Sequence, residues 1–425
     1  MAHAHRLLGL AMAAAAFGAV GQARAGSFSY VEIPPGAAGF VFNTGVSGDG
    51  KRAVGYTPAG IYYWTPDTGV IYTGGLPPGN GVGGRPRLSE DGTRMCGAYL
   101  DVDGKANASL FTFADFTWTL SPNMGANCDI TRTSAWEISR DGTVIVGLGY
   151  HQTQCNVRPS RWKVGDPATL PLFTWFGWNA RINGCNTNGT IMTGWQAQAD
   201  GRWMACMWKP SGTSWSQVRF LTPAGQLLPG EGQCMSDDGS RVFGSGWFGS
   251  KREPFMWTQA GGAVSLGASP LTNYNDGFGI GCTRAGDKVC CFFRPGGTPL
   301  AVGEGYMWIE GRGYVPLEQY AAEHGVTIPE GFRLAMPLDM SPDGLAIAGN
   351  ARSELGGFEC TFVLDLHPDQ QACPADLDGN RIVNGADLGM LLGNWGGQGV
   401  GDLNQDGTVN GADLGALLGA FGTCP

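Results

Sequence analysis

The stretch Ser236-Asp-Asp-Gly-Ser-Arg-Val-Phe-Gly244 decides the fold of the chain's body, because six other stretches repeat its pattern. Each copy opens on Ser-x-Asp-Gly or a close variant and continues into a short alternating run. The copies begin at Ser47, Ser89, Ser139, Asn186, Ser236, Thr283 and Ser341. Asp-Gly between two alternating segments is a preferred hairpin turn, because both residues tolerate positive φ. Each copy therefore predicts two strands joined by a tight turn.

The spacing of the copies sets the size of the repeated unit. Successive copies begin 42, 50, 47, 50, 47 and 58 residues apart, which is the length of a four-stranded propeller blade. A third strand in each copy carries a bulky aromatic, which we expect to pack between blades: Trp64, Phe111 or Phe113, Trp162, Trp208, Trp257, Trp308 and Phe362. The predicted fold class is mainly β, with a seven-bladed β-propeller over residues 26–366.

The seventh copy lacks the fourth strand that follows most of the others. Tyr30-Val-Glu-Ile-Pro-Pro-Gly36, near the N-terminus, matches the fourth-strand ending Leu76-Pro-Pro-Gly79 of the first copy. We therefore expect the N-terminal strand to complete the last four-stranded blade and to close the ring. Closure also covers the strand edges that an open array would expose.

Residues 1–25 have the pattern of a secretory signal peptide. One Arg precedes an apolar run, and Ala23-Arg24-Ala25 is a small-x-small cleavage site. No other stretch approaches twenty uncharged apolar residues, so no membrane span is expected. The net charge of −9 argues against nucleic acid as a partner. These features predict a secreted protein that is extracellular or on the cell surface.

The repeated core resembles the unit of extracellular bacterial HAF-repeat propellers, which carry a similar Ile-Ser-x-Asp-Gly-x-x-Val-Val-Gly pattern. The resemblance covers roughly residues 27–366 and includes residues 314–344, where LEQYAAEHGV predicts a short helix. It implies a propeller fold and an extracellular location. It implies no particular activity, because one fold hosts many functions.

From Cys373 onward the chain becomes acidic and holds two copies of a second motif, offset by 26 residues. Oxygen-bearing side chains stand at positions 1, 3, 5, 9 and 12 of each copy, and position 7 offers its backbone carbonyl, which supplies the oxygen ligands that Ca²⁺ requires. The predicted ligands are Asp376, Asp378, Asn380, Ile382, Asn384 and Asp387 in the first loop, and Asp402, Asn404, Asp406, Thr408, Asn410 and Asp413 in the second. A short apolar helix follows each loop.

The duplicated loops, with Asp at position 12, resemble a type I dockerin, an EF-hand-like domain here covering residues 373–425 after a linker at 367–372. The resemblance implies two bound calcium ions and a cohesin-like or cell-surface protein as partner. Arg381 occupies position 6 of the first loop, where Gly normally allows the sharp turn, so we expect the first site to be weaker. Gly385-Ala386 and Gly411-Ala412 stand where cohesin-binding dockerins often carry Ser or Thr, which leaves a cohesin partner open.

The twelve cysteines are compatible with disulfides in an oxidising compartment. A bond between Cys373 and Cys424 would join the ends of the small module and support a domain with Gly inside its helices. Cys128 and Cys155 form a second expected pair. The sequence leaves the pairing of the other propeller cysteines open.

Two functional hypotheses follow, and neither assigns a catalytic or cofactor-binding residue. The first is a secreted, non-enzymatic binding or scaffold protein, whose propeller recognises a glycan or protein while the module mediates attachment. A purely structural envelope component is not separable from it. The alternative is a carbohydrate-active enzyme of polysaccharide degradation with a carboxylate pair at the propeller channel. Candidates for a ligand-binding rim are tryptophans off the repeated aromatic position: Trp175, Trp178, Trp195, Trp203 and Trp215.

Overall fold

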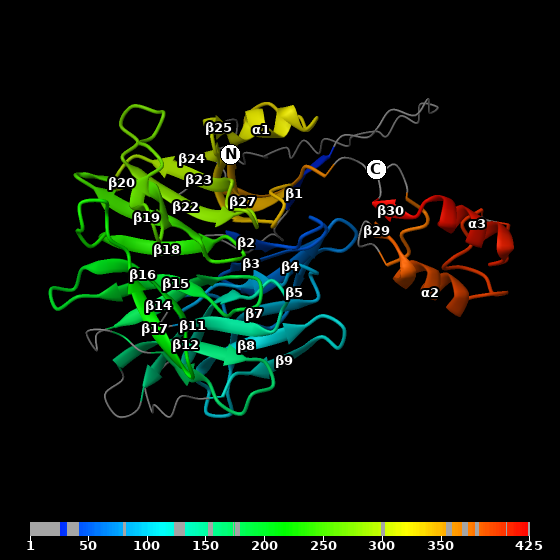
Figure 1. Cartoon of the computed structure of the whole chain (residues 1–425), viewed down its shortest axis with the longest axis horizontal. Coiled ribbons are helices and arrows are strands. Elements are labelled where there is room, and N and C mark those ends of the chain that lie inside the picture. The colour runs from blue at the N-terminus through cyan, green and yellow to red at the C-terminus, as the bar shows by residue number, and fades with distance from the viewer. Residues whose placement is uncertain are drawn as a thin grey trace, which may run out of the picture. The chain divides into compact units, whose positions relative to one another are not determined.

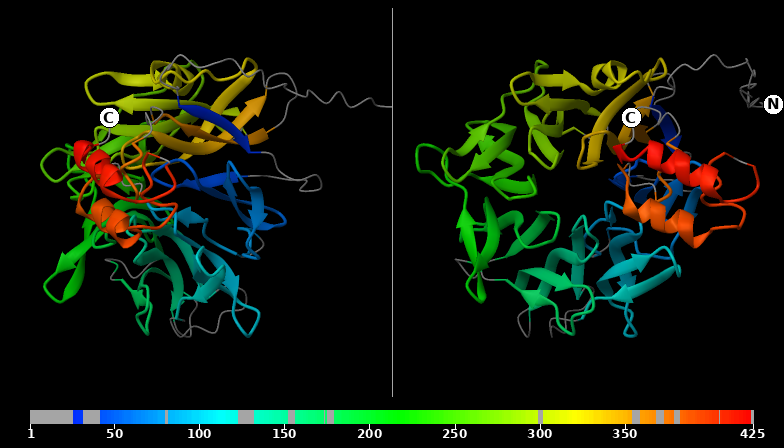
Figure 2. Two further views of the ribbon diagram at one scale, coloured as in Figure 1. Left: turned by 90° about the vertical axis from the view of Figure 1, so that its right-hand side faces the viewer. Right: turned by 45° about the vertical axis from the view of Figure 1, so that its right-hand side comes forward.

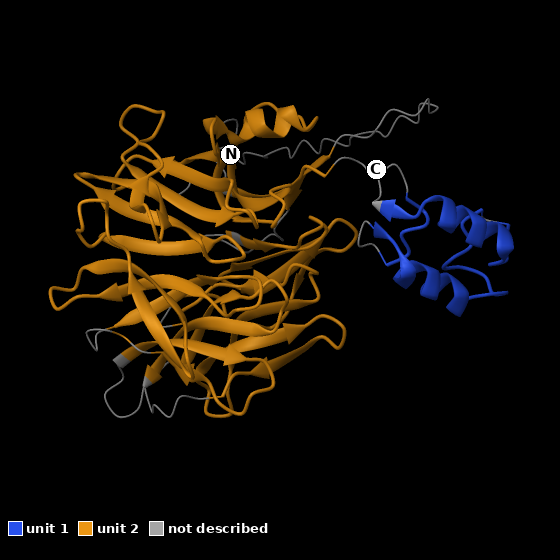
Figure 3. Ribbon diagram, in the orientation of Figure 1, with its two compact units in different colours: residues 1–25, 368–425 blue, residues 26–367 orange. Residues whose placement is uncertain are grey.

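The computed structural model describes residues 26–31, 42–79, 82–122, 132–151, 156–172, 174, 179–298, 302–353, 359–367, 373–378, 382–404 and 406–423. The chain divides into two compact units (Figure 3), one of Gly26–His367 and one that holds Pro368–Pro425. The expected signal peptide, residues 1–25, lies outside the described residues. No helix in the described part of the chain is long and apolar enough to cross a membrane.

Antiparallel sheets of four strands, each in chain order, begin the first unit (Figure 1). The first four sheets consist of β2 (Phe42–Val46), β3 (Ala53–Thr57), β4 (Gly60–Thr65) and β5 (Gly69–Tyr72); β6 (Arg87–Leu88), β7 (Arg94–Leu100), β8 (Ala106–Thr112) and β9 (Thr117–Leu120); β10 (Thr133–Ile138), β11 (Val144–His151), β12 (Asn156–Lys163) and β13 (Leu170–Pro171); β14 (Ala180–Cys185), β15 (Met192–Ala197), β16 (Trp203–Ser211) and β17 (Ser214–Arg219).

An eight-stranded sheet follows, in which one parallel pair, Arg252 with Asp276, joins two meanders. They are β18 (Gly230–Met235), β19 (Arg241–Phe248), β20 (Lys251–Thr258) and β21 (Gly262–Ser265), then β22 (Asp276–Cys282), β23 (Lys288–Arg294), β24 (Glu304–Ile309) and β25 (Gly313–Pro316). The expected short helix is α1 (Leu317–Glu323). The last sheet contains β26 (Phe332–Met340), β27 (Ala346–Ser353), β28 (Glu359–Asp365) and β1 (Ser27–Val31).

The sheets follow one another around a centre (Figure 2), and the unit is a β-propeller. β1 pairs antiparallel with β28, from Ser27 opposite Asp365 to Val31 opposite Thr361, which confirms the expected closure by the N-terminal strand. Hydrophobic clusters join neighbouring sheets, as where Trp208 packs with Val144. The repeated aromatics are buried there, except for the half-buried Trp308. Packing is therefore their role.

The Ser-x-Asp-Gly copies form the turns between the first and second strands of their sheets. In five copies the Ser Oγ donates to the Asp carboxylate two residues on, at 2.5–2.6 Å, and accepts the backbone N–H five residues on, at 2.7–3.1 Å. The Gly of all seven copies has φ between +63° and +78°, where an L side chain is strained. Each residue of the motif thus has a separate structural reason.

The expectation that both Asp and Gly take positive φ was wrong. The Gly N–H donates to the carbonyl three residues back, at 2.8–3.1 Å, so the motif is a longer turn with Ser first and Gly last. Among the described residues other than Gly, only Phe116 and Asn273 have positive φ. The Asp is required for its carboxylate, which organises the turn as a side-chain acceptor.

Consecutive turns are also bonded to one another around the ring. The backbone N–H groups of Gly48, Glu90, Asp237 and Arg284 donate to the carbonyls of Glu90, Arg140, Arg284 and Pro342, respectively. A bulge also interrupts the first strand of six units, each within four residues of the turn. A bulge bends its strand and redirects neighbouring side chains.

His367 lies at the end of the propeller unit, although the sequence placed it in the linker. Its Nδ1 is 2.5 Å from Asp365 Oδ1 and its Nε2 is 3.0 Å from Asp343 Oδ2. Lys51 Nζ donates to the other oxygen of Asp365 at 2.8 Å. Burial alone would raise the pKa of both carboxyls, but hydrogen bonds, from His367 foremost, outweigh burial and lower it.

The second unit consists of β29 (Ile382–Val383), α2 (Gly385–Gly393), α3 (Gly411–Gly419) and β30 (Gly422–Thr423), with β29 paired to β30. Its core is small and apolar: Ala375, Val383, Leu391, Val409 and Leu417. Cys373 is disulfide-bonded, and its expected partner Cys424 lies outside the described residues, as do Cys128 and Cys155. The other eight cysteines are free: Cys96, Cys185, Cys206, Cys234, Cys282, Cys290, Cys291 and Cys360.

We expect Ser89→Ala to lower the free energy of unfolding of the propeller by about 1–3 kcal/mol, because it leaves the Arg94 N–H and the Asp91 carboxylate without their shared partner. Urea unfolding of the wild type and the variant measures the change. Ser214→Ala, at an exposed position, is the control and should stay within about 0.5 kcal/mol. Equal destabilisation by both substitutions would contradict the role of the Ser.

We also expect acid to weaken the propeller through Asp343 and Asp365. Since folding lowers the pKa of both groups, their stabilisation is present above the ordinary carboxyl pKa of about 4 and is lost as pH falls through the lowered values. Thermal unfolding midpoints measured across this acid range should fall less steeply for the double variant Asp343→Asn, Asp365→Asn than for wild type. The exposed Asp67→Asn should leave the slope unchanged, and identical slopes for all three proteins would refute the prediction.

Candidate functional site

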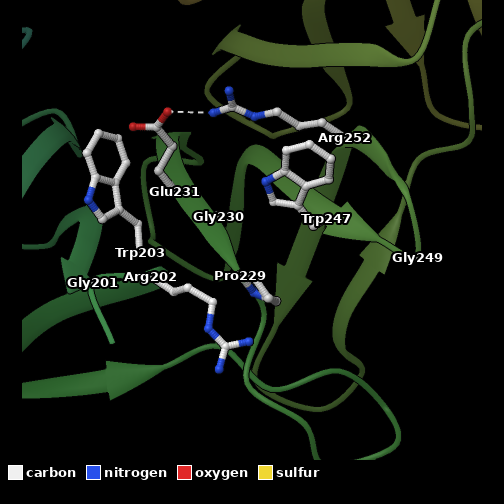
Figure 4. A pocket seen from close by; sticks show the side chains of 9 residues that line it. All are labelled: Gly201, Arg202, Trp203, Pro229, Gly230, Glu231, Trp247, Gly249 and Arg252. Carbon is white, nitrogen blue, oxygen red and sulfur yellow. Dashed lines mark hydrogen bonds and ion pairs between the residues drawn. The ribbon is translucent and has the colours of Figure 1, made fainter. Parts of the chain in front are cut away.

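A pocket of about 600 Å³ opens between the sheet of β14–β17 and the meander β18–β21 (Figure 4). Its volume lies in the range of ligand sites, about 300–1,000 Å³. The lining comes from the β15–β16 loop, the start of β18 and the β19–β20 hairpin: Gly201, Arg202, Trp203, Pro229, Gly230, Glu231, Trp247, Gly249 and Arg252. Because successive turns of an antiparallel meander alternate between its two ends, this face is opposite the Ser-x-Asp-Gly turns.

Two partly exposed indoles dominate the pocket. Trp203 is 45% and Trp247 49% exposed, and Figure 4 shows them on either side of the pocket. Trp203 stacks on Trp195, with ring centroids 4.2 Å apart and planes 7° apart. The Arg181 guanidinium lies 3.6 Å from the centroid of the Trp136 ring. It also lies within 6 Å of the ring centroids of Trp195 and Trp203. These contacts fix one indole while its outer face stays open.

Glu231 is the polar centre of the site. Its carboxylate accepts from Arg252 Nη2 at 2.8 Å on one oxygen, and from Arg181 Nη2 at 3.1 Å and Asn183 Nδ2 at 3.0 Å on the other. The side chain is 9% exposed, so each charge-assisted bond is strengthened by the exclusion of water. Through Arg181, Glu231 joins the sheet of β14–β17 to the meander β18–β21. It also sets the position of Arg252 within its own meander.

The local sequence explains why Glu231 can sit so deep. It lies between Gly230, whose φ is +152°, and Gly232, where a Cβ would come 1.9 Å from Thr193 Oγ1. Only Gly lets β18 approach β15 this closely. The bulge between Gly232 and Cys234 follows directly, so the strand end that bears Glu231 is set by three successive backbone features.

The structure separates the five tryptophans that the sequence proposed for a rim. Trp203 lines the pocket, and Trp195 stacks on Trp203. Trp215 lies outside the pocket lining and packs with Arg161. Trp175 and Trp178 lie outside the described residues. Sequence reasoning missed Trp247, Glu231 and Arg252. Trp247 also stands off the repeated aromatic position, so extending the same criterion to the fifth copy would have found it.

Among the described residues, three carboxylates line the channel cavity: Glu90, Glu137 and Asp339. Glu137 and Asp339 could form the pair that the enzyme hypothesis requires, but both face Arg87. Arg87 Nη1 is 2.7 Å from Asp339 Oδ1 and its Nε is 3.5 Å from Glu137 Oε2, with the arginine side chain 2% exposed. Burial raises the pKa of Glu137 more than the charge of Arg87 lowers it. The cavity beside them measures only about 60 Å³. Near the Ser-x-Asp-Gly turns, Arg284 likewise forms ion pairs with two carboxylates, Glu90 and Asp237.

The first C-terminal loop brings three predicted ligands together. Oxygens of Asp376, Asp378 and Asp387 all lie within 4.8 Å of one another. Asp387 is fully buried; burial would raise its pKa, but backbone N–H groups of Asn384, Asp378 and Leu377 donate to it and hold the pKa below its usual range. Asn380 lies outside the described residues. An all-oxygen, carboxylate-rich cluster fits a hard divalent cation such as Ca²⁺.

The second loop repeats the backbone hydrogen bonds to the Asp at position 12. Asp413 accepts from the backbone N–H groups of Asn410, Asn404 and Leu403 at 2.7–3.1 Å, which lower its pKa. Asp402 and Asp406 accept N–H groups of the loop itself. The position 9 residues, Asn384 and Asn410, cap α2 and α3 and donate to the position 7 carbonyls of Ile382 and Thr408. Their side chains thus shape the loops and start the helices.

No protein-family model and no curated protein matches the chain. Solved structures similar to it include TolB from Acinetobacter baumannii (14% identity, TM-score 0.38, 52% of this chain and 53% of that one). TolB from Agrobacterium tumefaciens has 13% identity and TM-score 0.41 over 66% and 88% of the two chains. The propeller of the Pyrococcus furiosus trilobed protease has 8% and 0.47 over 77% and 96%. The chain spans about half the length of the first, and likenesses this remote do not bear on what it binds.

Proposed function

We propose that the protein is a secreted binding protein whose propeller recognises a glycan in the pocket flanked by Trp203 and Trp247. Its C-terminal dockerin-like module binds two calcium ions and attaches it to a partner, a cohesin-like or cell-surface protein. The observation that carries the proposal is the pair of half-exposed indoles facing one pocket of ligand size. An exposed indole offers a flat apolar face and a polar N–H, which suits the C–H face of a sugar ring.

Rigidity supports a binding role for this pocket. Arg252 is held by its pair with Glu231, which also accepts from Arg181, and Trp203 is held by its stack on Trp195. A pre-organised site loses little conformational entropy when a ligand binds. An exposed indole with no such support would need to be ordered by each ligand.

A carbohydrate-active enzyme is the second candidate, and the raised pKa of Glu137 favours it, since a general acid must hold its proton at working pH. Against it, the channel cavity of about 60 Å³ is far smaller than a sugar site, and Arg87 pairs with both carboxylates. Hydrolysis of a polysaccharide that Glu137→Gln abolishes would establish the enzyme instead.

For the calcium module, support comes from the backbone of the second loop. Gly407, at position 6, has φ +93°, in the left-handed region; the first loop carries Arg381 at the corresponding position of its sequence, and a residue with a side chain costs on the order of 1 kcal/mol more than Gly in that region. That difference corresponds to about fivefold in affinity. The first site is accordingly the weaker one.

We expect Trp203→Ala and Trp247→Ala each to weaken glycan retention at least about tenfold, since each removes one stacking face. The full-length protein is passed over an immobilised panel of neutral and acidic oligosaccharides, and retained sugars are titrated by calorimetry. Trp395→Ala removes an equally exposed indole from the C-terminal module and should change nothing. Retention of no sugar, or retention by the Trp203 and Trp247 variants as strong as that of wild type, would exclude this pocket.

We expect calorimetric titration of the chelator-treated full-length protein with calcium to give two binding events, the stronger at the second loop. Asp402→Ala should remove the stronger event and Asp376→Ala the weaker one, because each deletes the position 1 ligand of its loop. Asp67→Ala, exposed in the propeller, is the control. A single event that survives both loop variants would contradict the assignment.

A further inference from the structure

We propose that the pocket between β15–β16 and β18–β20 selects an anionic glycan, whose sugars carry carboxylates as hexuronates do. The inference rests on the proposed function, because it names the ligand class of the same pocket. Its first support is the sign of the local charge. Three arginines and two carboxylates line or support the pocket: Arg181, Arg202, Arg252, Asp200 and Glu231. Together they leave one positive charge, on a protein whose net charge is −9.

The negative charge of Glu231 is directed at its hydrogen-bond donors and not at a ligand in the pocket. Its carboxylate already accepts three hydrogen bonds, and 9% of the side chain is exposed. Asp200 likewise accepts from Arg202 Nε at 2.6 Å. A ligand that enters the pocket therefore meets guanidinium groups whose orientation the carboxylates set.

Arg252 is held in place with donor capacity left over. Its Nη2 donates to Glu231 and to Ser245 Oγ, both at 2.8 Å, and its guanidinium lies 4.3 Å from the Phe278 ring. Its Nη1 makes no hydrogen bond to a described residue and is not among the buried polar atoms. Because Arg252 lines the pocket, this nitrogen is available to donate to a ligand acceptor. Arginine is the side chain best suited to a planar carboxylate.

The indoles explain why the anion is a sugar acid and not an acidic peptide. A hexuronate presents a flat C–H face to an indole and a carboxylate at its ring edge, so Trp203 or Trp247 can hold the ring while Arg252 or Arg202 holds the charge. A neutral hexose would stack on the indoles but would offer no carboxylate to pair with the arginines. A peptide carboxylate lacks the rigid ring face.

The test compares a galacturonate tetrasaccharide with its carboxyl-reduced, neutral counterpart by calorimetry on the full-length protein. We expect the acidic form to bind at least about tenfold more tightly at low salt, and this ratio to shrink as salt rises. Arg252→Gln and Arg202→Gln should each reduce the ratio. Arg202 is 66% exposed, so its variant keeps the test valid if Arg252→Gln unfolds. Arg312→Gln, an exposed arginine outside the pocket, should leave the ratio unchanged.

Two outcomes would overturn the inference and leave the proposed function standing. One is equal affinity for the acidic and the reduced tetrasaccharide, with both lost in Trp203→Ala. The other is a ratio that neither Arg202→Gln nor Arg252→Gln alters. Tighter binding of an oligoglutamate peptide than of either sugar would overturn the inference in favour of a protein ligand. If neither tetrasaccharide binds and the glycan panel also retains nothing, the proposed function fails with it.

Discussion

The hydrogen bond from a Ser Oγ to the Asp carboxylate two residues on is the contact on which the propeller depends. It fixes a turn, the turn fixes the register of a strand pair, and the register fixes which aromatic faces the next sheet. The turns are in addition joined to one another by backbone hydrogen bonds. Where Asn186 and Thr283 replace the Ser, each still accepts the backbone N–H five residues on. The constraint is thus a side-chain oxygen in that place, whichever residue supplies it.

Much of the fold could be predicted because it repeats. A pattern seen seven times identifies the turns, the third-strand aromatics and the missing strand that β1 supplies, since each copy checks the others. The backbone of the turn could not be predicted, because Asp-Gly alone does not distinguish a two-residue hairpin from the longer turn closed by Ser. The bulges of the first strands could not be predicted either, since the residue at the bulge differs from copy to copy.

The pocket was harder to predict than the fold, because its parts come from three loops with no shared pattern. Trp203 could be selected as an aromatic with no place in the repeat. Glu231 and Arg252 could not, because nothing in their local sequence says that the first and third strands of one meander place them 2.8 Å apart. In the C-terminal unit the opposite holds: each set of predicted ligands lies in one contiguous loop, and residue spacing alone brought Asp376, Asp378 and Asp387 together.

The pairing of β1 with β28 has a consequence for the order in which the molecule is made. Ser27 emerges early in synthesis, yet its partner Asp365 is among the last propeller residues to appear. Until then the nascent chain is an open row of sheets, and β1 has no partner strand because β28 has not yet formed. Contacts so distant in sequence form slowly. The ring is therefore most vulnerable to aggregation and proteolysis just before its two ends meet, and the residues beside β28, His367 and Lys51 among them, secure a junction that closes last.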